Sequence, residues 1–267
     1  MARFSGKTAV ITGAGQGLGR SIALQLVAEG ARVVALGRTQ RKLEITAEQA
    51  AAVPGGGNLS ILACDQSLPE QVEKSFAAIG ALLGRLDILI NNAGFYAHTS
   101  WSNTSCEDWM NVYNVNVISY VRMIQRIVPT MKTQGWGRVI NIGGGLGIQP
   151  INDLPHYNAS LAARHNMSVS LARQLSGTGI TSNVVAPGAI LNPGVEQWLR
   201  HAAPQKGWGT ELEEMERKAV KELVPNDAGR FGRQEEVAAA VLYLASPYAD
   251  YVSGALLRVD AGTVRSI

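Results

Sequence analysis

The sequence is poor in cysteine, in aromatic residues and in charge, and each shortage excludes a class of protein. Only Cys64 and Cys106 are present, without metal-ligand spacing, so we expect reduced thiols rather than disulfides or a zinc site. Charged residues make up 17% of the chain and no basic block occurs, which argues against a nucleic-acid partner. No apolar run approaches the roughly 20 residues of a membrane helix, and the N-terminal residues do not resemble a signal peptide. We therefore expect a cytoplasmic protein that binds neither membrane nor nucleic acid.

The 267 residues include 46% hydrophobic residues, enough for one large core and a single domain over 1–267. Continuous Val, Ile and Leu runs, typical of strands covered on both faces, alternate with amphipathic segments. Strands are expected at 7–12, 32–36, 59–64, 86–90, 137–142, 180–186 and 255–259, and helices at 17–29, 40–52, 69–83, 107–134, 156–176 and 234–245, with a break at 54–57. This alternation predicts an α/β fold with a doubly wound, Rossmann-like parallel sheet and helices on both faces.

One long segment, 191–230, departs from the alternation. It contains three prolines, one helical stretch near 211–222 and two tryptophans expected to be exposed, Trp198 and Trp208. A long insertion in a compact α/β unit is often a functional lid, so we expect this segment to select the substrate. Its tryptophans and methionine suggest an apolar or aromatic ligand, although such residues at helical spacing more often serve plain packing.

A glycine-rich stretch joins the first expected strand to the first expected helix. Glycine allows a tight turn and close approach to a pyrophosphate, and the following helix N-terminus offers free N–H groups and partial positive charge. The strand–turn–helix context makes the stretch a dinucleotide site rather than a simple turn. The residues expected to bind the cofactor here are Gly13, Gly15, Gln16, Gly17, Leu18 and Gly19.

The end of the second expected strand selects the coenzyme. An acidic residue there would hold the ribose hydroxyls of NAD(H), whereas this chain has Arg38, followed by Arg41 and Lys42. A guanidinium matches a 2′-phosphate, so the sequence favours NADP(H) over NAD(H). The alternative is that Arg38 is a solvated charge at a helix start.

Several further motifs in order resemble the short-chain dehydrogenase/reductase family over nearly the whole chain. They are Asp65 after the third strand, Asn91-Asn92-Ala93-Gly94 after the fourth, Asn116 on the long central helix and Pro187-Gly188 after the sixth. The resemblance implies about seven parallel strands, a homotetramer or dimer, and a nicotinamide at the carboxyl ends of the strands. It adds to the cofactor-binding residues Asp65, Gln66, Asn92, Ala93, Gly94, Tyr157, Pro187, Gly188 and Ile190.

The resemblance also implies a catalytic Tyr157 and a supporting Asn116, but it places apolar residues at two other catalytic positions. Leu161 stands at the position of the family's lysine, four residues after the tyrosine, and Gly144 at that of its serine. Without the lysine, Tyr157 should be a poor base, since tyrosine has a pKa near ~10, yet it can still donate a proton. We take Gly144, Leu161, His98 and Trp198 as candidate substrate contacts.

No neighbouring side chain is an obvious substitute for the missing lysine. Arg164 and His165 follow Tyr157 on roughly the same helix face, but their Cα atoms should lie about 10–12 Å further along the axis. We therefore expect them to be too far away, and arginine cannot release its proton. His156 should point about 100° away from Tyr157 around the helix.

Three functions remain open at this point. The favoured one is an NADP(H)-dependent oxidoreductase that transfers hydride to a carbonyl or activated C=C bond of a small apolar molecule, with Tyr157 as proton donor. The second is a non-redox isomerase, cyclase, lyase or hydrolase on the same fold. The third is a non-catalytic NADP(H)-binding subunit. Fold alone does not choose among them.

Overall fold

The computed structural model describes residues 2–53 and 58–265, so the break expected at 54–57 lies outside the described residues. Its centre is a seven-stranded sheet in the order β3-β2-β1-β4-β5-β6-β7, and every neighbouring pair is parallel. This confirms the predicted fold class. The strands are β1 Thr8–Ile11, β2 Arg32–Gly37, β3 Leu59–Ala63, β4 Ile88–Asn91, β5 Gly137–Ile142, β6 Ile180–Pro187 and β7 Leu256–Val259.

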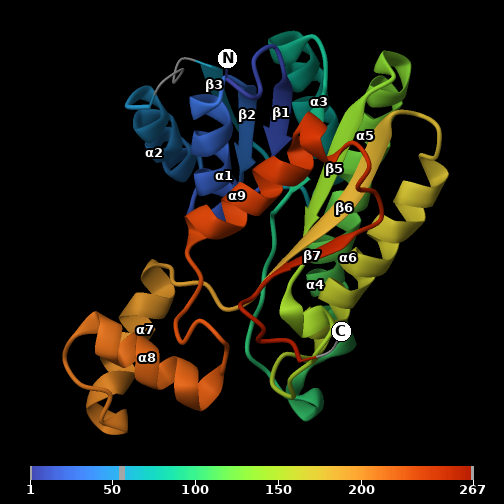
Figure 1. Cartoon of the computed structure of the whole chain (residues 1–267). Coiled ribbons are helices and arrows are strands. Elements are labelled where there is room, and N and C mark those ends of the chain that lie inside the picture. Colours follow the sequence, from blue (N-terminus) through green and yellow to red (C-terminus); the bar gives the residue numbers. More distant parts are fainter. Residues whose placement is uncertain (1, 54–57, 266–267) are drawn as a thin grey trace.

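Helices cover both faces of the sheet (Figure 1). Those of the described chain are α1 Gly17–Ala28, α2 Gln40–Ala51, α3 Pro69–Leu83, α4 Cys106–Tyr113, α5 Ser119–Gln134, α6 Pro155–Gln174, α7 Pro193–Lys206, α8 Leu212–Leu223 and α9 Gln234–Ala245. Helices α1, α2 and α9 pack on one face, and α3, α5 and α6 on the other. Along β1, Ala9 and Ile11 enter the first core and Val10 the second. Both faces of the strand are therefore buried, as the continuous apolar runs predict.

The central helix is less regular than its sequence suggests. The single helix expected over 107–134 is two α-helices joined by a π-helical turn, Asn114–Ile118. Helix α4 begins with a capping box between Ser105 and Asp108. A π-turn is rare and occurs frequently at functional sites, and this one contains Asn116.

The 191–230 segment forms two helices, α7 and α8, which lie beyond the carboxyl edge of the sheet, at the lower left of Figure 1. Only α8 was expected. The segment has a small apolar core of its own that includes Trp208. The prediction that Trp208 is exposed is wrong, because its ring is fully buried and its Nε1 donates to Glu222 at 2.9 Å. Trp198 packs edge-to-face on it and is 45% exposed.

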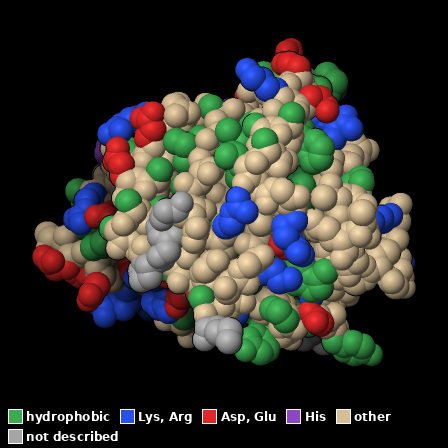
Figure 2. Space-filling model, turned by 90° about the horizontal axis from the view of Figure 1, so that it is seen from above, with side chains coloured by type: hydrophobic (Ala, Val, Ile, Leu, Met, Phe, Trp, Pro, Cys, Tyr) green, Lys and Arg blue, Asp and Glu red, His purple; other side chains and the backbone are tan. Residues whose placement is uncertain are grey.

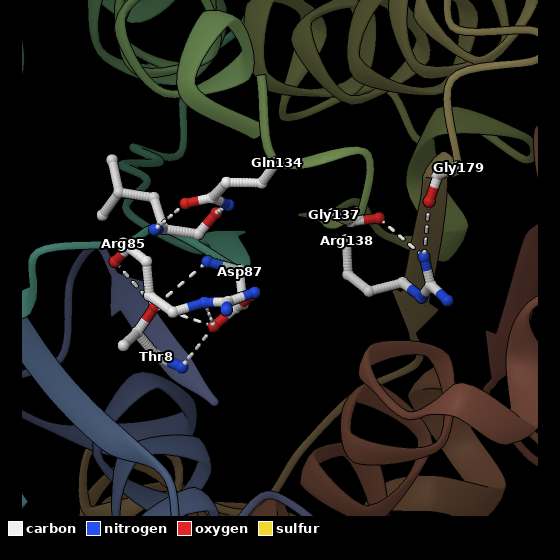
Figure 3. A network of polar contacts seen from close by, with 8 residues as sticks. Thr8, Arg85, Asp87, Gln134, Gly137, Arg138 and Gly179 are labelled. Carbon is white, nitrogen blue, oxygen red and sulfur yellow. Dashed lines mark hydrogen bonds and ion pairs between the residues drawn. The ribbon is translucent and has the colours of Figure 1, made fainter. Parts of the chain in front are cut away.

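Buried polar groups tie the strands together at the opposite, amino edge (Figure 3). The Asp87 carboxylate is fully buried and accepts from the Thr8 amide at 2.9 Å and from Arg85 at 2.5 Å. Arg138 donates to the carbonyls of Gly137 and Gly179. Seen from above, both basic and acidic side chains lie on the face shown (Figure 2).

Candidate active site

A cavity of about 290 Å³ opens where β1, β2 and β4 end. Twelve of the residues predicted to bind the cofactor line it: Gly13, Gly15, Gln16, Gly17, Leu18, Gly19, Arg38, Asp65, Gln66, Asn92, Ala93 and Gly94. The prediction did not include Gly37, Thr39, Ser67, Val115 or Ser119 among the lining residues. The first three adjoin predicted residues in the chain. Val115 and Ser119 reach the cavity through the π-turn and the start of α5, which no sequence motif indicates.

The glycine loop is shaped by close backbone contacts. A Cβ on Gly13, whose φ is +66°, would lie 2.9 Å from Asn92 Nδ2, and one on Gly19 would lie 2.4 Å from the Gly13 carbonyl oxygen. At Gly17, with φ +56°, nothing lies within 4 Å of the Cβ position. The first turn of α1 contains no acidic residue, and the Gln16 side chain does not cap it. The free N–H groups of this turn and the open space before it fit a pyrophosphate.

Cations lie on the β2 side of the cavity. Arg38 and Lys42 both line it, and neither forms an ion pair within the described residues. Arg41, also considered in the sequence, instead turns away to Glu44 and Glu48. No carboxylate lies at the end of β2 among the lining residues. The residues present therefore fit a phosphate group in addition to the pyrophosphate.

Four predicted cofactor residues are not among the lining residues of this cavity: Tyr157, described below, and three others. Gly188 packs against Asp260, where an added Cβ would come within 2.9 Å, and lines a separate cavity of about 220 Å³. Ile190 forms an isolated bridge with Gly232. Pro187 ends β6. Their part in binding the coenzyme stays a prediction.

Tyr157 lies in the first turn of α6, which begins at Pro155. Its ring is half-buried and packs on Tyr96, with 5.6 Å between centroids. Tyr96 follows the cavity-lining Gly94 by two residues, so the tyrosine pair stands next to the cavity. Burial raises the pKa of Tyr157 above its ordinary value, Arg164 lowers it, and Tyr96 raises it. The phenol is therefore protonated at neutral pH.

Asn116 is fully buried within the π-turn. Its Oδ1 accepts from the Phe95 amide at 2.8 Å, and its Nδ2 donates to the Phe95 carbonyl and to Ser160 Oγ. Ser160 Oγ in turn donates to the Tyr157 carbonyl at 2.7 Å. The side chain of Asn116 thus joins the loop after β4 to the first turn of α6, and it leaves its own backbone carbonyl for another donor.

Gly144 and Leu161, the positions that the resemblance equates with serine and lysine, are direct neighbours. A Cβ on Gly144 would lie 2.9 Å from Leu161 Cδ1. Leu161 is 1% exposed and Gly144 is also buried. Both therefore lie in the interior, and in this structure neither offers surface to a substrate.

Arg164 is placed differently from the expectation. Its guanidinium is buried and donates to three backbone carbonyls: Nε to Asn116 at 2.6 Å, Nη1 to Ile142 at 3.0 Å and Nη2 to Ala93 at 3.2 Å. The sequence estimate compared Cα positions only. Long helical side chains lean toward the helix N-terminus, and this one carries its charge back toward the tyrosine end of α6.

The three histidines near the site have distinct surroundings. His156 is buried against Trp109, and its Nδ1 accepts from the Tyr157 amide at 2.8 Å. Burial, followed by the charge of Arg164, lowers the pKa of His165 to about 4. His98 is exposed and pairs with Asp153 at 2.9 Å, which links the loop after β4 to the segment before α6. His98 thus stands on the rim near Tyr96, where it stays a candidate substrate contact, as does Trp198 on α7.

The glycine loop leaves space for phosphate groups before α1, and cations without ion-pair partners in the described chain lie at the end of β2. Tyr157 lies at the carboxyl edge of the same sheet. Together these features are those of a dinucleotide-binding oxidoreductase of the Rossmann type. Comparison with known proteins makes this specific. Residues 7–202, more than half of the chain, match the family model described as short chain dehydrogenase, and the chain belongs to this family. It is therefore an enzyme of the short-chain oxidoreductase type, for which an NAD(P) cofactor is typical.

The relatives align over almost their entire length. An uncharacterized oxidoreductase, YvaG, of Bacillus subtilis is 34% identical over 99% of this chain and 98% of its own. The 3-oxoacyl-[acyl-carrier-protein] reductase FabG of Thermotoga maritima is 32% identical over 98% and 99%. The crystal structure of L-sorbose reductase from Gluconobacter frateurii, complexed with NADPH and L-sorbose, superposes with a TM-score of 0.89 at 29% identity, covering all of both chains.

Among the described residues, no helix is long and apolar enough to cross a membrane, and no three or more His, Cys, Asp or Glu side chains lie together where they could hold a metal ion.

Proposed function

We propose that the protein is an NADP(H)-dependent reductase of a carbonyl or conjugated C=C bond in a small apolar molecule, with Tyr157 as the proton donor. The observation that carries the proposal is the cavity that the glycine loop shares with Arg38 and Lys42, which have no ion-pair partners in the described chain. The L-sorbose reductase that shares this fold was crystallised with NADPH.

The site residues divide the work between binding and proton transfer. The α1 N-terminus and the glycine loop bind the pyrophosphate, while Arg38 and Lys42 bind the 2′-phosphate. A bound NADPH supplies the hydride. Tyr157 donates its phenolic proton to the substrate oxygen, or to carbon in a conjugated C=C bond. Because burial raises its pKa, Tyr157 is protonated at neutral pH, which is the form that reduction requires, and it is a poor base for alcohol oxidation.

Two catalytic positions of the family are apolar in this proposal. Gly144 takes the place of the serine and Leu161 that of the lysine. Loss of a serine donor removes stabilisation of the developing oxyanion that can be worth on the order of ~3 kcal/mol. We therefore expect either slow turnover or a substrate that is already activated toward hydride transfer. The exposed aromatic side chains of Phe95, Tyr96 and Trp101 give the loop after β4 an apolar surface for such a substrate.

The proposal is tested first by binding. Isothermal calorimetry with NADPH and NADH should show preference for NADPH, and Arg38→Asp should reverse it, because the new carboxylate repels the phosphate and accepts from ribose hydroxyls. Turnover is then followed by the loss of NADPH absorbance with ketones, diketones, β-keto esters and enones. Tight NADPH binding without turnover of any of these compounds would indicate a binding subunit instead. Absence of binding to either coenzyme would overturn the proposal entirely.

A further inference from the structure

A buried cation without a carboxylate partner lies at the catalytic edge of the sheet. Arg164 is 3% exposed and donates to the carbonyls of Asn116, Ile142 and Ala93. Its guanidinium also stacks on the ring of Tyr120, 4.3 Å from the centroid. No carboxylate of the described residues forms an ion pair with it. Carbonyl dipoles and an aromatic face therefore solvate the charge but do not neutralise it.

Burying a guanidinium without a carboxylate partner lowers the stability of the fold. Removing a charge from water without an opposite charge is energetically unfavourable, and arginine cannot avoid this penalty by losing its proton. A neutral side chain would satisfy the same space without this penalty. The uncompensated charge instead stabilises any negative charge that forms nearby, since the local dielectric is low.

A Cβ added to Gly94, which lines the coenzyme cavity, would lie 3.1 Å from Arg164 Nη2, so the guanidinium borders that cavity. Few ionisable groups of the described residues face this cation. They are Tyr157 and His165 from its own helix α6, Tyr120 from α5 and, beyond Tyr157, Tyr96 from the loop after β4. Tyr120 is fully buried and its pKa is raised to about 12, mainly by burial. His165 is neutral. Tyr96 is exposed but lies beyond Tyr157, on which its ring packs. Of these groups in the described chain, Tyr157 is therefore the partly open one on which Arg164 can act during a reaction.

We propose that Arg164 supplies, from further along α6, the fixed positive charge that Leu161 cannot. The inference rests on the proposed function and assigns Arg164 as a positioning residue that works through Tyr157. As hydride reaches the substrate carbon, the bond between the Tyr157 oxygen and its proton breaks, and the proton moves to the substrate oxygen. The guanidinium stabilises the phenolate left behind, and water returns the proton to it afterwards. Arg164 keeps its own protons throughout.

A hydrogen bond links the π-turn to the Arg164 guanidinium. A π-helical turn interrupts the regular i→i+4 hydrogen bonding, and the Asn116 carbonyl accepts from Arg164 Nε at 2.6 Å. A purely structural role for Arg164 would be to satisfy this carbonyl. An experiment must therefore separate the charge from the hydrogen bonds.

The decisive measurement is the pKa of Tyr157 in the protein without coenzyme or substrate, by NMR of ring-labelled tyrosine. The Tyr157 signal is identified by its absence in Tyr157→Phe. Two neutral variants, Arg164→Met and Arg164→Gln, should raise this pKa by about one unit or more. Arg164→Gln keeps an amide donor for the carbonyls. The test can be made with whichever of the two neutral variants folds. Arg164→Lys, and Leu161→Lys combined with Arg164→Met, should return the pKa toward the native value.

Two outcomes overturn the inference: an unchanged Tyr157 pKa in a folded neutral variant, or failure of both lysine variants to restore it. Arg138→Met, which removes a buried cation at the other edge, is the matched control and should leave the Tyr157 pKa unchanged. In turnover, Arg164→Met should lower kcat at least 10-fold with little change in KM. Because the titration needs neither coenzyme nor substrate, absence of turnover contradicts the proposed function alone.

Discussion

Two arginines are buried at opposite edges of the same sheet, and their surroundings differ in one respect. Arg138, at the start of β5, is 1% exposed, pairs with Asp250 and stacks on Trp136 at 4.2 Å. Arg164 is buried almost as deeply but has carbonyl oxygens and a tyrosine ring where Arg138 has a carboxylate. Both guanidinium groups join chain segments, but a carboxylate neutralises the charge of Arg138, whereas no carboxylate of the described residues pairs with Arg164. We call the amino edge of the sheet, where Arg138 lies, the structural edge, and the carboxyl edge, where Arg164 lies, the chemical edge.

Tyr157→Phe should have the largest effect of the variants considered, and it should lower the reaction rate without changing the stability of the fold. Removing a positioned proton donor typically lowers the rate by roughly 10²–10⁴-fold. The variant should keep its NADPH affinity, because the phosphate-binding residues are untouched. Steady-state kinetics and calorimetry measure the two quantities. Retention of full activity would show that another group donates the proton.

Arg138→Met should show the reverse behaviour at the structural edge. It removes two bonds to carbonyls, the pair with Asp250 and the stacking on Trp136. We expect the free energy of unfolding to fall by about 2 kcal/mol, since Asp250 is 63% exposed and regains water. Denaturant unfolding measures this loss, and kcat should not change. If Arg138→Met were as stable as the native chain but lost activity, the structural role given to Arg138 would be wrong.

His165 extends the comparison to pH. Its pKa of about 4 in the folded chain lies below the ordinary 6.5, so the unfolded chain binds a proton first as pH falls. This group stabilises the fold fully above pH 6.5, and the contribution is lost as pH falls toward 4. The loss is on the order of 2 kcal/mol. Unfolding at several pH values should show it in the native chain and not in His165→Gln.

Arg164 sharpens this pH test, because its charge is the second cause of the lowered His165 pKa. Arg164→Met should therefore raise the His165 pKa, which histidine NMR detects. Arg138→Met should leave it where it is. Equal His165 titrations in the native chain and Arg164→Met would contradict an uncompensated charge at position 164.

The smallest effect is expected for Gly144→Ser. A Cβ at this position would lie 2.9 Å from Leu161 Cδ1, and Leu161, being buried, has little room to move. Overpacking of this kind costs about 1 kcal/mol or slightly more. The added change Leu161→Lys should relieve the contact, so a double-mutant cycle of unfolding free energies should show coupling between the positions. Additive effects would mean that the two side chains do not meet.

Local sequence patterns predicted the sheet correctly, and they also indicated twelve residues that line one cavity, whose binding of a cofactor stays a prediction. Apolar runs buried on both faces indicate parallel strands, and a glycine loop such as Gly13 to Gly19 carries its geometry in its own residues. The same reasoning failed where a contact joins distant segments. Trp208 has no local feature that indicates its bond to Glu222, and α7 includes Pro193 and Pro204, which disfavour a helix assignment.

Arg164 shows the same limit at the site. Counting residues along a helix gives the spacing of Cα atoms, but it does not give the direction of a long side chain. The carbonyls that hold the guanidinium come from the loop after β4, the π-turn and the end of β5, which only tertiary folding brings together. The sequence contained the arginine, and its surroundings required the structure.

The contact between Gly144 and Leu161 also limits which mutational paths are open to this chain. A serine at 144 meets an occupied space while leucine stands at 161, so the first of the two changes is disadvantageous when made alone. A gene carrying this pair must pass through a less stable intermediate, or change leucine first, before it gains a hydroxyl in the interior. Laboratory selection for faster reduction would therefore be expected to change residue 161 before residue 144.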